Sequence, residues 1–199
     1  DRIASGESSD VPRFSPDGFC KDTTHLSVID RDGNCVSMTH SLGMPSGVIT
    51  DGLGFQYNGC MGVFDPRPGR AGSIAPGKAR FSSICPSIIF RDGSPYIVIG
   101  APGATQISMG VLQAILNIID FDASMSEAVA LPRFSATSNA IDVTNRIPHH
   151  VTQQLSSGGY PIIRSPKSFG VAWVHGIRVT ESGFEGGADP GGDGVALGF

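Results

Sequence analysis

Several features that would assign a function class are missing from this sequence. Its four cysteines, at positions 20, 35, 60 and 85, form no Cys-x-x-Cys pair, so their spacing indicates neither a zinc site, nor a redox motif, nor a disulfide framework. Basic residues are not in excess. The net charge is −4 with both signs mixed, so we expect neither nucleic acid nor an anionic membrane as a partner. No apolar run is expected to reach the length of a membrane span.

The first residues carry no targeting signal. Residues 1–22 are polar, are interrupted by Pro and Gly, and contain neither an initiator Met nor a signal-like segment. We therefore expect residues 1–22 to be the end of an upstream part or a linker, and residues 23–199 to be the C-terminal part of something longer. The cellular compartment stays open.

The composition favours a sheet-rich domain. The chain has 199 residues, 40% of them hydrophobic, which is enough for one domain with a proper core, and 27 glycines and 14 prolines make it rich in turns. Apolar runs at 87–90 and 96–99 flank a turn and predict a hairpin that is covered on both faces. Other strands are expected at 48–50, 54–57, 141–143 and 171–179, and an irregular loop at 65–78.

Helices are expected after that hairpin. Residues 107–119 are apolar on nearly every side, which predicts a buried helix, and Thr105 is placed to cap its N-terminus. Ser124 and Glu127 have the spacing of a capping box before a short helix. Pro148 fits the first turn of a third helix. Strands, then helices, then strands around two covered hairpins predict a layered α/β sandwich.

The stretch with the sharpest structural prediction is residues 23–41. Two β-prone runs flank residues 30–34, whose composition is that of a type I turn followed by a left-handed glycine, Gly33. Such a loop fixes the strand register. Thr23 then lies opposite Ser41, with Cβ atoms roughly 5 Å apart, and a slip of one residue would remove this pairing.

The two faces of this hairpin differ in character. One face is apolar and is expected to be a core face. The other is rich in hydroxyl groups, which are costly to bury unless they are paired or used. The apolar face consists of Leu26, Val28, Val36 and Met38, and the polar face of Thr23, His25, Ser27, Ser37, Thr39 and Ser41.

Thr23 has two interpretations on the residues alone. It is an ordinary strand residue, or it is an N-terminal nucleophile whose own α-amino group acts as the base that a threonine hydroxyl needs. The second interpretation requires a cut between Asp22 and Thr23. Nothing in the composition or the periodicity indicates such a cut.

A series of motifs resembles one known family, in the family's order. The motifs are Thr23-Thr24-His25-x-Ser27-Val28-x-Asp30-x-Asp32-Gly33-Asn34, Phe81-Ser82-Ser83-x-x-Pro86, Ala101-Pro102-Gly103-Ala104, Ala130-x-Pro132-Arg133-Phe134 and Ala188-Asp189-Pro190. They are similar to the small subunit of the γ-glutamyltranspeptidases, N-terminal-nucleophile hydrolases with an αββα sandwich. The resemblance implies a precursor that cleaves itself before the threonine. It also implies that the large subunit of the same precursor, to which residues 1–22 would then belong, is the partner.

The resemblance also assigns roles to individual residues. It implies that Thr23 is the nucleophile, that its freed amine is the base, and that Ser41 supports it. The pair Gly103-Ala104 stands where the family has two glycines whose backbone N–H groups form the oxyanion hole, and an alanine is expected to serve there only if its φ is negative. The pair Ser82-Ser83 stands where the family holds the α-carboxylate of the substrate.

Departures from the family pattern concern the amino group of the substrate. The family holds it with an Asn, a Glu or Gln, and an Asp, and these places are taken by Gly43, Cys60 and Val63. An ammonium group without acceptors is costly in a closed site. The acyl group is therefore expected to differ from a standard γ-glutamyl, and a desamino analogue such as glutaryl, as in the related cephalosporin acylases, is the alternative.

The function that these motifs indicate is amide hydrolysis or acyl transfer on a small molecule, without cofactor or metal. A non-catalytic relative that keeps the fold as a binding module is the alternative, and cleavage before Thr23 separates the two. A metal site made of His25, His40 and Cys35 is disfavoured because the register puts the histidines on opposite faces. The Gly-rich segment 186–193 resembles a calcium-binding repeat, but a single copy cannot stack.

Overall fold

The computed structural model describes residues 23–199, so the predictions for residues 1–22 lie outside the described residues. The strands are β1 (Thr23–Ile29), β2 (Cys35–Ser41), β3 (Pro45–Ile49), β4 (Gln56–Asn58), β5 (Ser87–Arg91), β6 (Ser94–Gly100), β7 (Phe134–Ser135), β8 (Ile141–Val143), β9 (Ile162–Arg164), β10 (His175–Thr180) and β11 (Gly183–Ala188). The helices are α1 (Ile107–Phe121), α2 (Met125–Ala130) and α3 (His149–Ser157), with 3₁₀ turns η1 (Cys60–Val63) and η2 (Ala104–Gln106).

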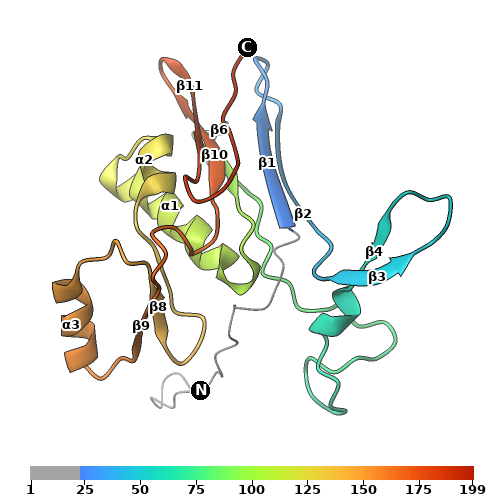
Figure 1. Cartoon of the computed structure of the whole chain (residues 1–199). Helices are drawn as coiled ribbons and strands as arrows, with labels where there is room; N and C mark the ends of the chain where they lie inside the picture. The colour runs from blue at the N-terminus through green and yellow to red at the C-terminus, as the bar shows by residue number, and fades with distance from the viewer. Residues whose placement is uncertain (1–22) are drawn as a thin grey trace.

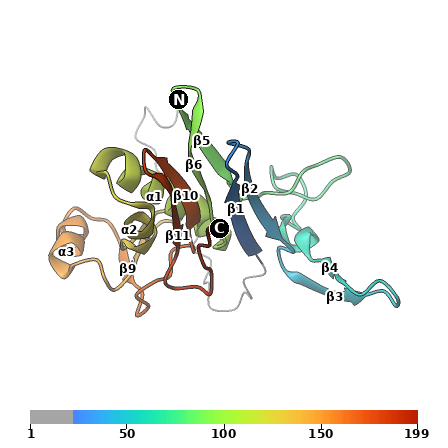
Figure 2. The same cartoon turned by 90° about the horizontal axis from the view of Figure 1, so that it is seen from above.

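The central part of the molecule has three layers (Figures 1 and 2). The middle layer is a four-stranded sheet in the order β11-β10-β6-β5, in which every neighbouring pair is antiparallel. Helices α1 and α2 pack on one face of this sheet, and the β1–β2 hairpin lies on the other face. The layered α/β fold predicted from the sequence is therefore confirmed.

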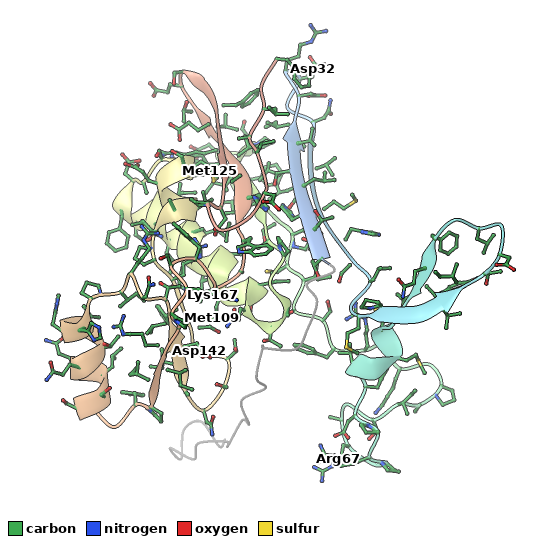
Figure 3. The ribbon with its side chains drawn as sticks, viewed as in Figure 1. Asp32, Arg67, Met109, Met125, Asp142 and Lys167 are labelled. Atoms are coloured by element: carbon green, nitrogen blue, oxygen red, sulfur yellow. The ribbon has the colours of Figure 1, made fainter. Side chains whose placement is uncertain are left out.

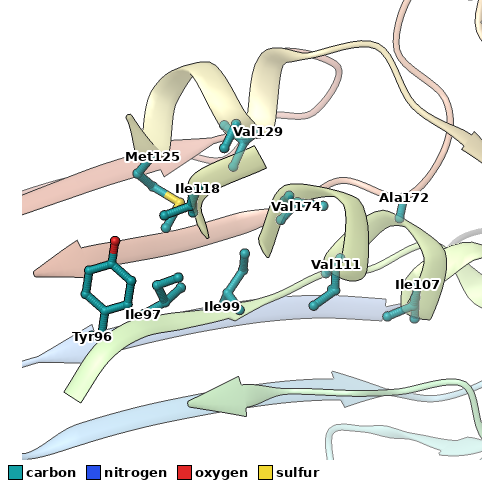
Figure 4. Close-up of a cluster of buried hydrophobic side chains, with 13 residues drawn as sticks. Tyr96, Ile97, Ile99, Ile107, Val111, Ile118, Met125, Val129, Ala172 and Val174 are labelled. Atoms are coloured by element: carbon teal, nitrogen blue, oxygen red, sulfur yellow. The ribbon is translucent and has the colours of Figure 1, made fainter. Parts of the chain in front are cut away.

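The hydrophobic core lies between the helices and the middle sheet (Figure 4). Helix α1 buries side chains at the spacing of one helical face, and β6 is buried along most of its length. The core residues drawn and labelled are Tyr96, Ile97, Ile99, Ile107, Val111, Ile118, Met125, Val129, Ala172 and Val174. This packing positions the loop at the end of β6, where candidate site residues lie.

Helix α1 differs from its prediction in two ways. Its far side is exposed, as Leu112 and Ile119 show, so it is covered on one face only. Thr105 lies in the 3₁₀ turn η2, and Gln106 is the N-cap, so the predicted capping role of Thr105 is wrong. The capping box of Ser124 and Glu127 is confirmed, because each side chain bonds the backbone N–H of the other.

The segment Ala104–Phe121 is also long and apolar enough, by length and composition, to cross a membrane, contrary to the sequence-based expectation. A core helix satisfies the same test. In this fold the segment contains α1, whose buried face packs on the middle sheet, and that packing accounts for its apolar character.

Smaller units flank the three layers. The β3–β4 pair and η1 form an arm beside the end of β2, followed by the irregular loop predicted at 65–78, with Arg67 at its outer end (Figure 3). Strands β7, β8 and β9 form a separate sheet beside α3. The late strand predicted from residue 171 begins only at His175, because Ala172 has φ 52° and packs into the core instead.

The orientation of the β1–β2 hairpin corrects the sequence prediction. The apolar face expected in the core points away from the middle sheet, and its side chains, Leu26, Val28, Val36 and Met38, are 39% to 51% exposed. The polar face packs on β6 instead, where Ser37 Oγ donates to the carbonyl of Ile99 at 2.9 Å. Strand β5 is likewise covered incompletely, since Phe90 is exposed.

Candidate active site

The turn of the β1–β2 hairpin has the predicted geometry. Gly33 has φ 83°, and the backbone N–H of Asp30 donates to the carbonyl of Asn34 at 3.0 Å. The register is the predicted one, with Thr23 opposite Ser41. Their hydroxyl oxygens are 2.8 Å apart, at the end of the hairpin opposite the turn that Asp32 marks in Figure 3.

Ser41 connects Thr23 with the next turn of the chain. Its Oγ also accepts a hydrogen bond from the backbone N–H of Gly43 at 2.9 Å. Gly43 has φ 71°, and a Cβ added there would lie 2.9 Å from Cys60 Sγ, so the thiol crowds the position of a side chain at residue 43. The Cys60 thiol donates to the carbonyl of Leu42 at 3.4 Å.

The loop after β6 contains the pair expected to form the oxyanion hole. Gly103 is buried against Ala172, whose Cα would lie 2.6 Å from a Cβ at residue 103, so only glycine fits without a shift. Ala104 has φ 53°, so the condition set for an alanine in this pair, a negative φ, is not met. The left-handed conformation costs an alanine roughly 1–2 kcal/mol. Neighbouring contacts hold it in place: the backbone N–H of Trp173 donates to the carbonyl of Pro102 at 2.9 Å.

The pair expected to bind a carboxylate lies beside this loop. The Ser83 hydroxyl donates to the carbonyl of Ala104, and Ser82 Oγ accepts from the backbone N–H of Ile84 at 3.3 Å. The structure therefore brings Ser83 to the loop at 101–104, which is called the oxyanion loop below for the role expected of it. The structure also brings Thr23 and Ser41 together, on the β1–β2 hairpin that lies against the middle sheet.

His25 links these two groups. It is 8% exposed, with Nδ1 2.9 Å from Thr39 Oγ1 and Nε2 2.9 Å from Ser27 Oγ. Its ring lies over Gly100, the residue that leads into the oxyanion loop. Burial lowers the pKa of His25 to about 4, and His175 on β10 contributes to the same shift. His25 was expected on the polar face of the hairpin without a role in the site, and its two-residue spacing from Thr23 is the signal that places it there.

A cleft of about 470 Å³ lies between β1, the start of β10 and the last residues of the chain. Thr23, His25, Pro102 and His175 line it, and Thr23 is the only predicted site residue among its lining residues. A larger hollow, of about 820 Å³, is lined by Tyr96 and Arg178 and by none of the predicted site residues. Within residues 23–199, no group of three or more His, Cys, Asp or Glu could hold a metal ion.

Comparisons with known proteins point to one family. The sequence profile described as "Gamma-glutamyltranspeptidase" matches residues 14–199. The chain is 41% identical over 155 residues to an acylase ACY 1 proenzyme of Pseudomonas sp. (strain V22). The aligned region covers 77% of this chain and 28% of that protein. It is also 34% identical over 192 residues to a glutathione hydrolase proenzyme of Pseudomonas aeruginosa. The aligned region covers 88% of this chain and 34% of that protein.

The same relationship appears in solved structures. The chain superposes with a TM-score of 0.78 and 32% identity on a γ-glutamyltranspeptidase of Pseudomonas nitroreducens complexed with L-DON. That match covers 88% of this chain and 99% of the matched chain. The chain thus spans about a third or less of the two proenzymes, yet nearly all of a separate chain in a related enzyme.

Proposed function

Because this chain belongs to the γ-glutamyltranspeptidase family, we propose that residues 23–199 are the catalytic small subunit of an amide hydrolase or acyltransferase whose nucleophile is Thr23. The observation that carries the proposal is the 2.8 Å contact between Thr23 Oγ1 and Ser41 Oγ. Thr23 is also the first residue of β1, where a cut would free its amine without breaking the strand.

The amine released by cleavage before Thr23 is the general base. It takes the proton from Thr23 Oγ1 as this oxygen attacks the amide carbonyl carbon. Ser41 Oγ accepts from the N–H of Gly43, so its own proton is available for Thr23 Oγ1. That hydrogen bond holds the nucleophile in one rotamer and stabilises its oxygen as charge develops.

Attack converts the carbonyl oxygen into an oxyanion, which accepts hydrogen bonds from the backbone N–H groups of Gly103 and Ala104. Ala104 lacks the negative φ that an alanine is expected to need at this place, and it serves here because the contacts of the loop hold its left-handed conformation. Collapse of this intermediate breaks the C–N bond, and the ammonium of Thr23 protonates the departing amine. An acyl ester on Thr23 Oγ1 remains. Water or an acceptor amine then attacks the ester and gives a proton to the Thr23 amine. The bond between the acyl carbon and Thr23 Oγ1 breaks, the ammonium returns the proton to Oγ1, and the acyl product leaves.

The partner is the large subunit from the same precursor. The curated relatives are proenzymes about three times longer than the matched region, which supports a precursor of that kind. In an αββα sandwich a second helical layer covers the outer sheet. Residues 23–199 supply no helix on the outer face of the β1–β2 hairpin, which instead exposes Leu26, Val28, Val36 and Met38. We assign that face to the large subunit.

The acyl donor is either γ-glutamyl or a desamino analogue such as glutaryl. The geometry at Gly43 favours the second, because Gly43 offers no side chain to an ammonium group and Cys60 Sγ crowds the position that a Cβ would take there. The similarity to an acylase proenzyme points in the same direction. A site without acceptors must desolvate the α-ammonium and loses charge-assisted hydrogen bonds worth roughly 1.5–3 kcal/mol each.

The choice of donor is tested by kcat/KM for a glutaryl and a γ-glutamyl anilide. We expect the wild-type enzyme to cleave the glutaryl anilide at least as efficiently. Gly43→Asn combined with Cys60→Ala, which makes room for the new Cβ, should shift the ratio toward γ-glutamyl, and Cys60→Ala alone is the control. A wild-type preference for γ-glutamyl of about tenfold or more, or 1.4 kcal/mol, would contradict this assignment.

The proposed nucleophile is tested by trapping the acyl ester. The processed enzyme is mixed with an anilide donor and quenched in acid, and its peptides are mapped by mass spectrometry. The acyl group should sit on the peptide that begins with Thr23. An acyl group on Ser41 or Ser83 would assign a different nucleophile, and processed protein with no turnover of either anilide would favour the non-catalytic alternative.

A further inference from the structure

The two halves of the candidate site belong to different layers. Thr23 and Ser41 are on the β1–β2 hairpin, and the oxyanion loop at 101–104 follows β6 of the middle sheet. Within residues 23–199 the hairpin forms no ladder of backbone hydrogen bonds with that sheet, because β1 and β2 pair only with each other. Side-chain contacts between the layers must therefore set the distance from the nucleophile to the oxyanion hole.

One of these contacts is made by His25. It lies two residues after Thr23 on the same strand face, and its ring rests on Gly100, which immediately precedes the oxyanion loop. A Cβ added at residue 100 would overlap this ring, and the three nearest atoms are all imidazole atoms of His25. The glycine thus allows an approach that any other residue would prevent.

Hydrogen bonds fix the ring in this position. Nδ1 is bonded to Thr39 on β2 and Nε2 to Ser27 on β1, so the imidazole also ties the two hairpin strands together. His175 stands opposite Gly100 in the β10–β6 register and closes the space on one side. Ser37, bonded to the carbonyl of Ile99, provides a second attachment to β6.

We propose that His25 is a positioning residue that sets the placement of Thr23 relative to the oxyanion loop through its contact with Gly100. This inference rests on the proposed function. His25 acts through its neighbours: its two ring nitrogens are occupied by Thr39 and Ser27, so it takes no part in proton transfer with the substrate.

The test uses the enzyme obtained from the full precursor after it has cleaved itself. The variants are His25→Ala, His25→Gln, Gly100→Ala and the double variant His25→Ala/Gly100→Ala. Each single change should lower kcat by about 10- to 100-fold, because a displacement near 1 Å of reacting groups has effects of this size, while KM stays within about threefold. His25→Gln, which keeps a hydrogen-bonding group, should fall between wild type and His25→Ala. The matched control is His150→Gln, on the exposed side of α3.

The double variant separates positioning from simple packing. Removing the ring relieves the overlap in Gly100→Ala, so Tm should rise above that of the Gly100→Ala protein. The link between the layers remains lost, so kcat should stay low. Recovery of kcat together with Tm, or kcat of His25→Ala within twofold of wild type, would overturn the inference. Wild-type protein that neither processes nor turns over an anilide would instead overturn the proposed function.

Discussion

At the scale of single residues, the candidate site depends on small groups in unusual conformations. Gly43 and Gly103 adopt φ values of 71° and 153°, and both have a neighbouring side chain or backbone where a Cβ would be. Ala104 adopts φ 53° with a Cβ present. A non-glycine residue held in this region stores local strain, and such strain concentrates at functional sites.

His25 gives a prediction for the pH dependence of stability. Its pKa is lowered from 6.5 to about 4, first by burial and then by His175, whose own pKa burial also lowers. Between pH 4 and pH 6.5 the unfolded chain therefore binds more protons at residue 25 than the folded chain does. The free energy of unfolding decreases as pH falls from 6.5 toward 4. Over this range we expect the processed wild-type protein to lose about 2–3 kcal/mol relative to His25→Gln.

The measurement is urea unfolding of both proteins at pH 7.5 and pH 4.5. Asp193 and Thr23 share the cleft with the two histidines and are unchanged in both proteins, so the difference between them isolates residue 25. A difference in unfolding free energy that is the same at both pH values would show that His25 titrates normally in the folded protein.

At this scale, features with local determinants follow from the sequence. The pairing of Thr23 with Ser41 follows from the turn at 30–34, because loop type fixes register over a few residues. The conformation of Ala104 could not be predicted in this way. It depends on Ser83, some twenty positions upstream, and on the segment around Ala172, far downstream.

At the scale of elements, the oxyanion loop is supported by the segment 171–173. Arg133, almost fully buried, donates to the carbonyls of Val171 and Ala172 and forms an ion pair with Asp189. Burial lowers the pKa of Arg133, and Asp189 opposes this effect. The pair fixes the segment that packs against Gly103, so the end of β11 is connected to the candidate site.

Asp189→Asn should therefore destabilise the processed protein. The change leaves the Arg133 charge buried without its partner, which costs about 3–5 kcal/mol in comparable buried pairs. Chemical denaturation measures this loss, with the exposed Asp51→Asn as the matched control. A loss below about 1 kcal/mol would mean that the four backbone carbonyls around Arg133 satisfy it without the carboxylate.

The orientation of the β1–β2 hairpin is the element-level feature that the sequence did not predict correctly. Alternation along the strands separated an apolar face from a polar face, and that separation is confirmed. Which face meets the middle sheet depends on groups elsewhere in the fold: Gly100 admits the His25 ring and the Ile99 carbonyl accepts from Ser37. A pattern of apolar residues predicts that a face is covered, but it does not identify the part of the protein that covers it.

At the scale of the whole molecule, residues 23–199 form three of the layers of an αββα sandwich. The matched γ-glutamyltranspeptidase chain has nearly the same extent, so this portion corresponds to a unit that exists as a separate chain in a relative. We assign the apolar outer face of the hairpin, 39% to 51% exposed at its four side chains, to the packing of a further layer.

Val36→Lys tests this assignment. A charged side chain at the centre of a buried apolar contact should weaken association of the two processed parts by about tenfold or more, since burying an unpaired charge is strongly unfavourable. Native mass spectrometry over a dilution series measures the association. Tyr160→Lys, at a residue 57% exposed near α3, is the control. Equal association of both variants would place the large subunit elsewhere.

Processing of the precursor tests the central claim most directly. Intact mass spectrometry of the purified full-length precursor, incubated without added protease, shows whether the chain splits before Thr23. The account predicts that wild type splits there, that Thr23→Ser splits more slowly because it keeps a hydroxyl, and that Thr23→Ala stays whole. A Thr23→Ala precursor that still splits before residue 23, or a wild-type precursor that never does, would contradict the assignment of Thr23 as the nucleophile.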